Sequence, residues 1–331
     1  MKKIAINGLG RIGKQFLIAS LNKKLPFEFV INTHSELDSI VYDLKHDSVH
    51  PPIKEEVKIK EGMLIIGKRK IKVYNELDPE KLPWKKEGID LVIECTGNFT
   101  DREGASKHLK AGAKKVLISA PAKNPDKTIV LGVNENTLNS SDKIISCASC
   151  TTNCVAPLIK ILNDELKIKS AIFITTHAYT ATQRVIDGSD KKDERRGRAA
   201  GVNIVPTTSG ASQSVVEVIP ELKGKVGGYA LRIPVIDGSF ASIVAQVESS
   251  TTKEKVNSLF KKYSNSKMHS LLEYSEEPLV STDIINNPSS AIFDKDFTEV
   301  IGNQVSIGAW YDNELGYANR LAELASLIVD K

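Results

Sequence analysis

Short apolar runs alternate with amphipathic segments along the first half of the chain. Mostly apolar runs that predict buried strands occupy residues 3–6, 27–31, 89–95, 115–118 and 129–132. Amphipathic segments that predict helices follow the first run, up to about residue 22, and occupy residues 101–111. Residues 57–74 alternate and predict a small antiparallel meander inserted in the domain. This order of strands and helices predicts a doubly wound parallel sheet.

The second half of the chain has a different pattern. Apolar and polar side chains alternate over residues 171–176, 241–247, 297–301 and 305–310, as in strands with only one buried face. Helical spacing returns at residues 155–166, 251–263 and 318–329. We therefore expect a second, α+β domain with a mixed, mainly antiparallel sheet and helices on one face.

A glycine-rich turn, GLGRIG at residues 8–13, joins the first predicted strand to the first helix. In such a turn Gly8 allows the tight bend, Gly10 lets the backbone approach a pyrophosphate, and Gly13 permits close packing of helix on strand. The pyrophosphate would lie on the helix N-terminus, beside Arg11 and Ile12. Because a second strand follows the helix, the pattern favours a Rossmann-type dinucleotide site over glycines that serve only the turn.

Two later strands end in small polar residues. Thr96 and Gly97 follow the run at 89–95, and Ser119 follows the run at 115–118. Ligands of open parallel sheets gather at the carboxyl ends of the strands. We therefore expect Thr96, Gly97 and Ser119 to contact the cofactor.

The candidate nucleophile lies in the segment SCASCTTNC, residues 146–154. Cys150 stands where a strand-like run at 143–145 gives way to a helix, and a helix N-terminus favours the reactive thiolate. Ser149 and Thr151 supply capping and hydrogen bonds around it. Three other interpretations are a zinc site, a dithiol redox pair and buried structural thiols. The cysteines lack the second separated pair typical of zinc sites, and structural thiols leave the surrounding hydroxyls unexplained.

Composition narrows the class of protein. The 331 residues, 41% of them hydrophobic, are enough for two domains. We expect no signal peptide and no membrane span, and four cysteines favour a reducing compartment, here the cytoplasm. A net charge of +4, with Lys and Glu interspersed, does not indicate nucleic-acid binding.

Anion-binding signals appear in the second half. Ser209 and Gly210 stand just before an apolar helix, where N–H groups form an anion cradle, although the same hydroxyl would serve simple helix capping. Arg232 ends a strand-like segment and has the fork geometry that suits phosphate.

The segment ASCTTNC at 148–154 resembles the active-site signature of phosphorylating glyceraldehyde-3-phosphate dehydrogenases, and the resemblance extends over nearly the whole chain. It implies a nucleotide domain of residues 1–149 and 314–331, to which the last helix returns, and a catalytic domain of residues 150–313. It implies a homotetramer in glycolysis or gluconeogenesis, without a metal.

The resemblance also assigns roles to single residues. It makes Cys150 the nucleophile and His177 the base, paired so that the thiol pKa falls and a thiolate–imidazolium pair forms. Asn313, otherwise a turn residue, would hold the nicotinamide carboxamide. The implied phosphate ligands are Thr180 and Arg232 for the substrate, and Ser149, Thr151, Ser209, Gly210 and Arg196 for the attacking phosphate.

The cofactor-side residues depart from the NAD-specific pattern. Thr33 stands where NAD-preferring members have Asp, and Gly188 and Ser189 stand where they have a bulky Leu-Pro pair. An Asp would repel a 2′-phosphate, so these residues favour the acceptance of NADP, either together with NAD or in preference to it. The alternative is that the change is neutral and that Glu36 or Asp38 binds the ribose.

Three other functions remain open from the sequence. An erythrose-4-phosphate dehydrogenase tends to lose the Tyr-Thr pair after the histidine, whereas Tyr179 and Thr180 are retained here. The paired phosphate sites argue against a semialdehyde dehydrogenase. A dinucleotide-binding regulator without turnover would not need both Cys150 and His177.

Overall fold

The computed structural model describes residues 1–191, 193–266 and 268–331. The chain folds into two compact units, each described by itself below. Unit 1 contains Met1–Ile129, Asn136–Ala148 and Ala318–Lys331, and unit 2 contains Val130–Glu135 and Ser149–Tyr317.

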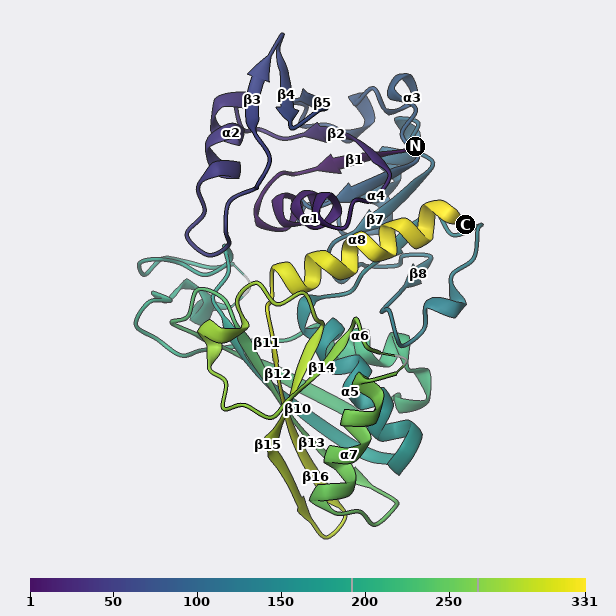
Figure 1. The fold of residues 1–331 in the computed structure, drawn as a ribbon, viewed down its shortest axis with the longest axis vertical. Helices are drawn as coiled ribbons and strands as arrows, with labels where there is room; N and C mark the ends of the chain where they lie inside the picture. Colours follow the sequence, from purple (N-terminus) through teal and green to yellow (C-terminus); the bar gives the residue numbers. More distant parts are fainter. Residues whose placement is uncertain (192, 267) are drawn as a thin grey trace. The chain divides into compact units, whose positions relative to one another are not determined.

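Unit 1 is built on one sheet in the order β3-β4-β5-β2-β1-β6-β7-β9-β8. Neighbouring strands from β5 to β8 are parallel, and β3, β4 and β5 form the predicted antiparallel meander at one edge (Figure 1). The strands are β1 (Lys2–Asn7), β2 (Phe27–Asn32), β3 (Val57–Lys60), β4 (Met63–Ile66), β5 (Arg69–Tyr74), β6 (Leu91–Glu94), β7 (Lys115–Ile118), β8 (Lys127–Thr128) and β9 (Ile144–Ser146).

The predicted strand at 129–132 is wrong. The strand β8 ends at Thr128, and the following residues turn, with the Val133 N–H donating to the Val130 carbonyl at 3.1 Å. Asn134 fixes this turn because its Oδ1 accepts from the Val130 N–H at 2.9 Å. Ile129 and Val130 are buried in this turn. A short apolar run is therefore found in a buried turn as well as in a buried strand, and four residues are too few to distinguish the two.

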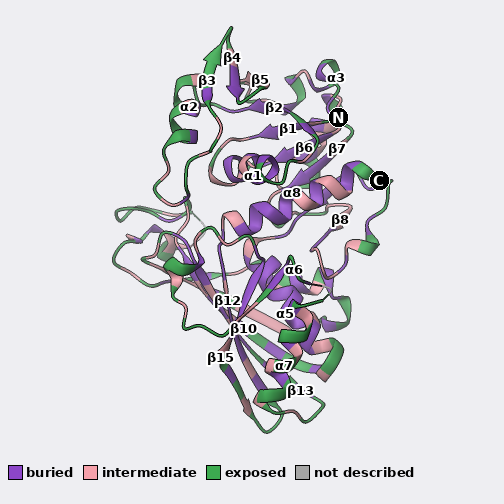
Figure 2. Ribbon diagram, in the orientation of Figure 1, coloured by how far each residue is buried: buried purple, intermediate pink, exposed green. Residues whose placement is uncertain are grey.

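Apolar strands and helices form the core of unit 1, where the central strands are almost entirely buried (Figure 2). On one face Ala5, Val92 and Val116 pack with Trp84 and with Ala105 of a helix. A parallel sheet covered on both faces needs continuous apolar strands, which is why these strands were predictable. The helices are α1 (Arg11–Asn22), α2 (Leu37–Lys45), α3 (Trp84–Glu87), α4 (Arg102–Lys110) and, from Ala318 on, α8 (Leu315–Asp330).

The end of the chain is anchored within unit 1. Lys23 Nζ lies 2.7 Å from Glu323 Oε1, which joins α1 to α8. Lys115 Nζ donates to the Ile328 carbonyl of α8 at 3.3 Å.

Unit 2 holds a mixed sheet in the order β11-β12-β10-β13-β16-β15-β14. Most pairs are antiparallel, but β10 pairs with β12 and β14 with β15 in parallel. The strands are β10 (Ile168–Ala178), β11 (Val205–Thr208), β12 (Val226–Ile233), β13 (Ser239–Val247), β14 (Leu272–Ser275), β15 (Ala291–Ile301) and β16 (Gln304–Tyr311).

The strands of unit 2 alternate in burial because helices cover only one face of the sheet (Figure 1). The apolar helix α5 contacts β10, β13, β15 and β16. The helices are α5 (Cys150–Leu166), α6 (Ala211–Val218) and α7 (Lys253–Ser264).

Candidate active site

Cys150 is the first residue of α5 and Ser149 is its N-cap. The Thr152 N–H donates to Ser149 Oγ at 3.0 Å, and the hydroxyls of these two residues lie 2.7 Å apart. The predicted change from strand to helix is confirmed, since β9 ends at Ser146 and α5 begins at Cys150. The sulfur therefore stands at a capped helix N-terminus.

His177 faces this sulfur from the adjacent strand β10. Its Nε2 lies 3.4 Å from Cys150 Sγ, and its side chain is only 2% exposed. The two side chains are separated by 27 positions in sequence and come from a helix start and a strand end. This is the reach that a nucleophile and its base require.

Burial acts on the pKa of both members of this pair. Burial raises the pKa of the Cys150 thiol, although the Arg232 guanidinium and hydrogen bonds from Thr151 lower it. Burial and the Arg232 charge lower the pKa of His177 to about 3. Burial disfavours the charged form of both groups and so acts against the expected fall of the thiol pKa, while the Arg232 charge and the Thr151 hydrogen bonds favour the thiolate. The thiolate–imidazolium pair stays a prediction.

Arg232 lies beside His177 because β10 and β12 pair in parallel with these two residues in register. Its Nη1 lies 2.6 Å from His177 Nδ1 and 3.2 Å from the carbonyl oxygen of Ala178. Of the predicted substrate-phosphate ligands, Arg232 is thus the one placed directly at the Cys150–His177 pair.

Tyr311 is a site residue that the sequence did not reveal. Its hydroxyl lies 3.0 Å from Thr151 Oγ1 and 2.7 Å from Thr175 Oγ1, and its ring meets the His177 ring edge to face at 5.8 Å. Tyr311 is buried, and it holds the first turn of α5 against β10. Only the pairing of β13 with β16 brings it there, so no local signal could have identified it.

Ser239 was also missed, and it orients Asn313. It donates to Asn313 Oδ1 at 2.6 Å and accepts from the Ala178 N–H at 3.1 Å. Asn313 is 4% exposed and held further by its N–H, which donates to Asp237 Oδ1 at 3.2 Å. Among the described residues its Nδ2 has no partner, which leaves a donor for a carboxamide oxygen.

A cavity of about 570 Å³ lies at the loop after β10. Gln183 fixes the start of this loop, since its Oε1 accepts from both the N–H and the hydroxyl of Thr180, at 2.9 and 3.0 Å. Arg196, in the short helix η3 (Glu194–Gly197), lines the cavity together with Ser189. Gly188 lies in the same loop, bonded through its N–H to the Gly197 carbonyl at 2.8 Å. The cavity is lined by Ala181, Thr182, Gln183, Arg184, Ser189, Asp190, Lys191 and Arg196.

Two predicted phosphate ligands precede α6. Ser209 Oγ accepts from the Ala211 N–H at 3.2 Å, and Gly210 is the N-cap of the helix without a side-chain cap. Ser209 therefore makes the local bond that simple capping predicts. In the described chain no hydrogen bond joins Ser209 or Gly210 to Cys150, so the structure does not bring these predicted ligands together by direct contact.

The glycine turn of unit 1 follows β1 at the start of α1. Gly8 has φ +92°, and a Cβ on Gly13 would lie 2.1 Å from the Gly8 carbonyl oxygen. Gly10, the N-cap of α1, has no side-chain cap bond and open space where a Cβ would stand. These features fit a pyrophosphate at the N-terminus of α1, beside Arg11 and Ile12, because a helix N-terminus offers N–H donors and the glycine turn leaves room for an anion.

Three predicted cofactor contacts follow neighbouring strands of the same sheet. Thr33 follows β2, Thr96 follows β6 and Ser119 follows β7, in a sheet where β2, β1, β6 and β7 are adjacent. Gly97, next to Thr96, has φ +74°. These residues therefore lie at the carboxyl ends of the parallel strands, the same end of the sheet as Gly8, as expected for ligand contacts.

Glu94 bonds to residues at this carboxyl end of the sheet, and the sequence did not identify it as a site residue. It is 1% exposed, its Oε1 accepts from the Thr96 N–H at 2.7 Å, and its Oε2 accepts from Asn7 Nδ2 at 2.6 Å. The buried His108 lies 3.1 Å from the same Oε2. Glu94 ends an otherwise apolar strand, so the sequence pattern predicted it as part of the core.

Thr33 is 7% exposed, and its N–H donates to the Tyr74 carbonyl at 3.0 Å. Its Oγ1 accepts from the Ser35 N–H at 3.4 Å. Glu36 and Asp38, the alternative ribose ligands, are exposed at the start of α2.

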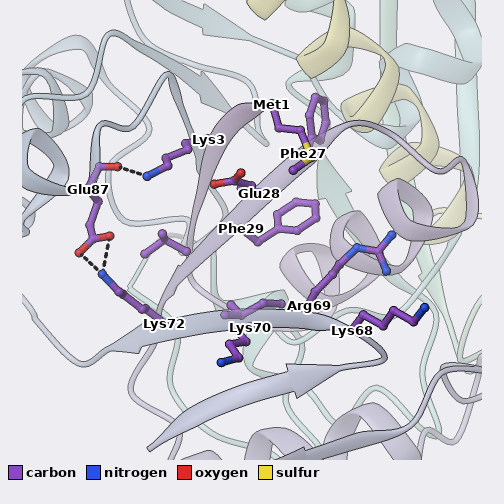
Figure 3. Close-up of a pocket in the computed structure, with 12 residues that line it drawn as sticks. Met1, Lys3, Phe27, Glu28, Phe29, Lys68, Arg69, Lys70, Lys72 and Glu87 are labelled. Atoms are coloured by element: carbon purple, nitrogen blue, oxygen red, sulfur yellow. Dashed lines mark hydrogen bonds and ion pairs between the residues drawn. The ribbon is translucent and has the colours of Figure 1, made fainter.

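A hollow in unit 1, about 400 Å³, lies at the amino ends of β1, β2 and β5, and Figure 3 shows the residues that line it. Gly8 follows the opposite, carboxyl end of β1. Glu87 holds two of its lysines: its backbone carbonyl accepts from Lys3 at 3.1 Å, and its carboxylate pairs with Lys72 at 2.9 Å. This hollow is separate from the predicted cofactor edge.

The remaining cysteines differ from Cys150. Cys147 and Cys154 are buried free thiols, and burial raises the pKa of Cys154. Burial also raises the pKa of Cys95 to about 12. Burial raises the pKa of Cys150 too, so what distinguishes Cys150 is the contact of its Sγ with His177 Nε2 at 3.4 Å. The burial of the other thiols fits the structural interpretation. Within the described part of the chain, no helix combines the length and apolar character that crossing a membrane requires.

A Rossmann-type sheet and a cysteine–histidine pair at a helix N-terminus fit the class of nucleotide-dependent dehydrogenases, with Cys150 as the candidate nucleophile. Residues 2–102 match the family model for the glyceraldehyde 3-phosphate dehydrogenase NAD binding domain, and residues 149–313 match that for the C-terminal domain. The chain therefore belongs to the glyceraldehyde-3-phosphate dehydrogenase family, and it carries an NAD-binding domain.

The chain is similar in sequence to curated relatives over nearly its full length. Glyceraldehyde-3-phosphate dehydrogenase 1 of Bacillus subtilis is 44% identical over 331 residues, covering 99% of this chain and 98% of its own. The Geobacillus stearothermophilus enzyme has the same identity and coverage. Glyceraldehyde-3-phosphate dehydrogenase 2 of a Nostoc species is 45% identical, covering 100% of this chain and 99% of its own.

Proposed function

We propose that the protein is a phosphorylating glyceraldehyde-3-phosphate dehydrogenase. It would oxidise glyceraldehyde 3-phosphate and use inorganic phosphate to form 1,3-bisphosphoglycerate. The observation that carries this proposal is the 3.4 Å approach of Cys150 Sγ to His177 Nε2 at the capped N-terminus of α5. Membership of the family supplies the substrate.

Cys150 performs the covalent step. Its sulfur attacks the aldehyde carbon: the C–S bond forms, the C=O π bond breaks, and the carbonyl oxygen takes the proton of the thiol to become a hydroxyl. His177 Nε2 takes the hydroxyl proton as the carbon is oxidised, which leaves a thioester on Cys150. Inorganic phosphate then attacks the thioester carbon, the C–S bond breaks, and the thiolate leaves. The bound nicotinamide would supply the hydride acceptor.

Anion-binding residues position the two phosphates. We assign Thr180 and Arg232 to the phosphate of the substrate, since Arg232 lies beside His177 and Gln183 fixes Thr180. The attacking phosphate is assigned to Ser149, Thr151, Arg196, Ser209 and Gly210.

The cofactor would be held by the edge of unit 1 that carries Gly8 and Gly10, with Arg11, Ile12, Thr96, Gly97 and Ser119. Asn313 would bind the carboxamide through its free Nδ2. We assign residues 1–149 and 314–331 to the nucleotide domain and 150–313 to the catalytic domain. Location in the cytoplasm and assembly as a homotetramer complete the proposal.

NADP is proposed as an accepted cofactor. Thr33 places no carboxylate at the end of β2, and Gly188 and Ser189 are small. Changing Thr33→Asp would place a negative charge there, so kcat/KM with NADP should fall while kcat/KM with NAD is kept. Steady-state kinetics with both cofactors test this, and a large preference of the unchanged protein for NAD would contradict it.

Replacement of the sulfur tests the central assignment. Cys150→Ser should abolish formation of reduced nicotinamide from glyceraldehyde 3-phosphate and phosphate. The matched control is Cys154→Ser, one helical turn further along α5, which removes a buried thiol outside the reaction and should retain turnover. Appreciable activity in Cys150→Ser would refute the assignment.

A further inference from the structure

A chain of buried polar side chains crosses the carboxyl end of the sheet in unit 1. Asn7 and Glu94 are register partners on β1 and β6, and Asn7 Nδ2 donates to Glu94 Oε2 at 2.6 Å. His108 of α4 lies 3.1 Å from the same oxygen through its Nε2, and its Nδ1 lies 3.0 Å from Trp84 Nε1. These side chains are at most 1% exposed, so bulk water cannot replace a bond that is lost here.

The bond between Trp84 and His108 fixes the hydrogen of the imidazole. An indole N–H only donates, and Trp84 is the one partner of His108 Nδ1 among the described residues, so this nitrogen accepts and carries no hydrogen. His108 is therefore neutral, with its hydrogen on Nε2, and it donates to Glu94 Oε2. Asn7 Nδ2 lies 3.4 Å from His108 Nε2, because both nitrogens donate to that oxygen.

Glu94 accepts hydrogen bonds on both of its carboxylate oxygens. Its Oε1 accepts from the Thr96 N–H at 2.7 Å and from the Thr96 hydroxyl, which itself accepts from the Asn98 N–H at 3.1 Å. No lysine or arginine of the described chain pairs with Glu94, and all its partners can donate. Hydrogen bonds rather than a cation therefore hold this buried carboxylate.

The bonds to Thr96 fix a turn that packs against the glycine turn. Gly97 has φ +74°, and a Cβ on Gly8 would lie 2.9 Å from both the nitrogen and the Cγ2 of Thr96. The two turns are thus in direct contact, and a displacement of one displaces the other. Backbone N–H groups bind an anion only within a narrow range of distances, so a dinucleotide needs both turns in place.

We propose that Glu94, held by His108, is a positioning residue for the dinucleotide. Its carboxylate fixes the turn at residues 96–98 against Gly8, and His108 keeps the carboxylate in place by donating to it. Both residues act through Thr96 and are not ligands themselves. This inference rests on the proposed cofactor site in unit 1.

Calorimetry with NAD and with NADP measures this role without turnover. In Glu94→Gln one side of the amide can still accept from Thr96, but the other presents hydrogens to Asn7 and His108. We expect the Kd of the tighter cofactor to rise about tenfold or more, the loss that follows a broken hydrogen bond to a charged group. The KM for that cofactor should rise while the KM for glyceraldehyde 3-phosphate is kept. Hydrogen exchange at residues 95–100 of the cofactor-free protein should be faster.

A pair of variants at His108 keeps the test independent of how Glu94→Gln folds. His108→Leu removes the donor to Glu94 and should weaken cofactor binding in the same way. His108→Gln, whose amide can donate to the carboxylate, should restore most of the affinity. The matched control is Glu87→Gln at the amino end of the sheet, where the buried carboxylate accepts from Lys72 and Tyr74. This control should lose stability and keep the Kd.

An unchanged Kd in Glu94→Gln or His108→Leu would overturn the positioning role, and so would a Kd that rises equally in Glu87→Gln. In these cases the unchanged protein still binds the cofactor, and the proposed function stands. If the unchanged protein binds neither NAD nor NADP, the proposed cofactor site fails, and the positioning role fails with it.

Discussion

Single residues set the charge of both candidate sites. In unit 2 burial raises the pKa of Cys150, against the opposing effect of the Arg232 cation, and burial together with that cation lowers the pKa of His177. In unit 1 the carboxylate of Asp47 accepts from Arg11 Nη1 at 2.5 Å and also pairs with Lys14, both in the first turns of α1. The helix N-terminus at the glycine turn is thus fixed by one carboxylate.

Asp47→Asn tests that carboxylate. Burial alone would raise the pKa of Asp47, but hydrogen bonds from Arg11 and Lys14 outweigh it and hold the pKa well below its ordinary value. The variant should lose about 1–3 kcal/mol of stability at neutral pH, as for a hydrogen-bonded charge that loses its partner. It should also bind the cofactor more weakly, since Arg11 is released.

The pH dependence has a definite sign. A carboxyl whose pKa is lower in the folded state stabilises the fold above its unfolded pKa, and this stabilisation is lost as the pH falls. The stability difference between the two proteins should be complete near neutral pH and should shrink below about pH 4. Urea denaturation across this range measures it, with the exposed Asp38→Asn as control; a difference that grows in acid would contradict the assignment.

At the scale of elements, the N-terminus of α5 joins stability to chemistry. Ser149→Ala removes the acceptor of the Thr152 N–H and should cost about 1 kcal/mol. It should also lower kcat/KM, because the loosened turn carries Cys150. Thr252→Ala is the matched control: it removes the N-cap of α7, where Lys255 N–H donates to Thr252 Oγ at 3.3 Å, and should lose similar stability with kcat/KM unchanged. Equal kinetics in both variants would show that the cap is only structural.

The predictable elements are those whose signal is local. Parallel strands such as β6 are continuous apolar runs, and the glycine turn has a characteristic spacing of glycines, so both could be predicted from the sequence. The run at 129–132 misled because a buried turn has the same composition. Tyr311 reaches Thr151 over 160 positions through strand pairing, and no short pattern encodes such a contact.

At the scale of the whole molecule, the uncovered face of the second sheet predicts assembly. Ile172 and Val244 are paired across β10 and β13 and are 60% and 44% exposed, and Tyr229 on β12 is 44% exposed. Contiguous exposed apolar side chains of this kind mark interaction sites. A second copy of this chain would bury them in the proposed homotetramer.

Ile172→Lys should therefore shift the protein to smaller species in analytical ultracentrifugation, because a buried lysine charge opposes the interface. Leu77→Lys, at a side chain of unit 1 that is 75% exposed, is the control and should leave the sedimentation unchanged. An unchanged mass for Ile172→Lys would show that this face is not part of the interface.

Trapping the acyl-enzyme is the most direct test of the proposal that Cys150 is the nucleophile. The protein is mixed with glyceraldehyde 3-phosphate and oxidised cofactor without inorganic phosphate, quenched in acid, and analysed by intact-mass and peptide mass spectrometry. We expect one phosphoglyceroyl group per chain, attached to Cys150 and released on adding phosphate. An unmodified Cys150, or an acyl group on Cys95, Cys147 or Cys154, would contradict it.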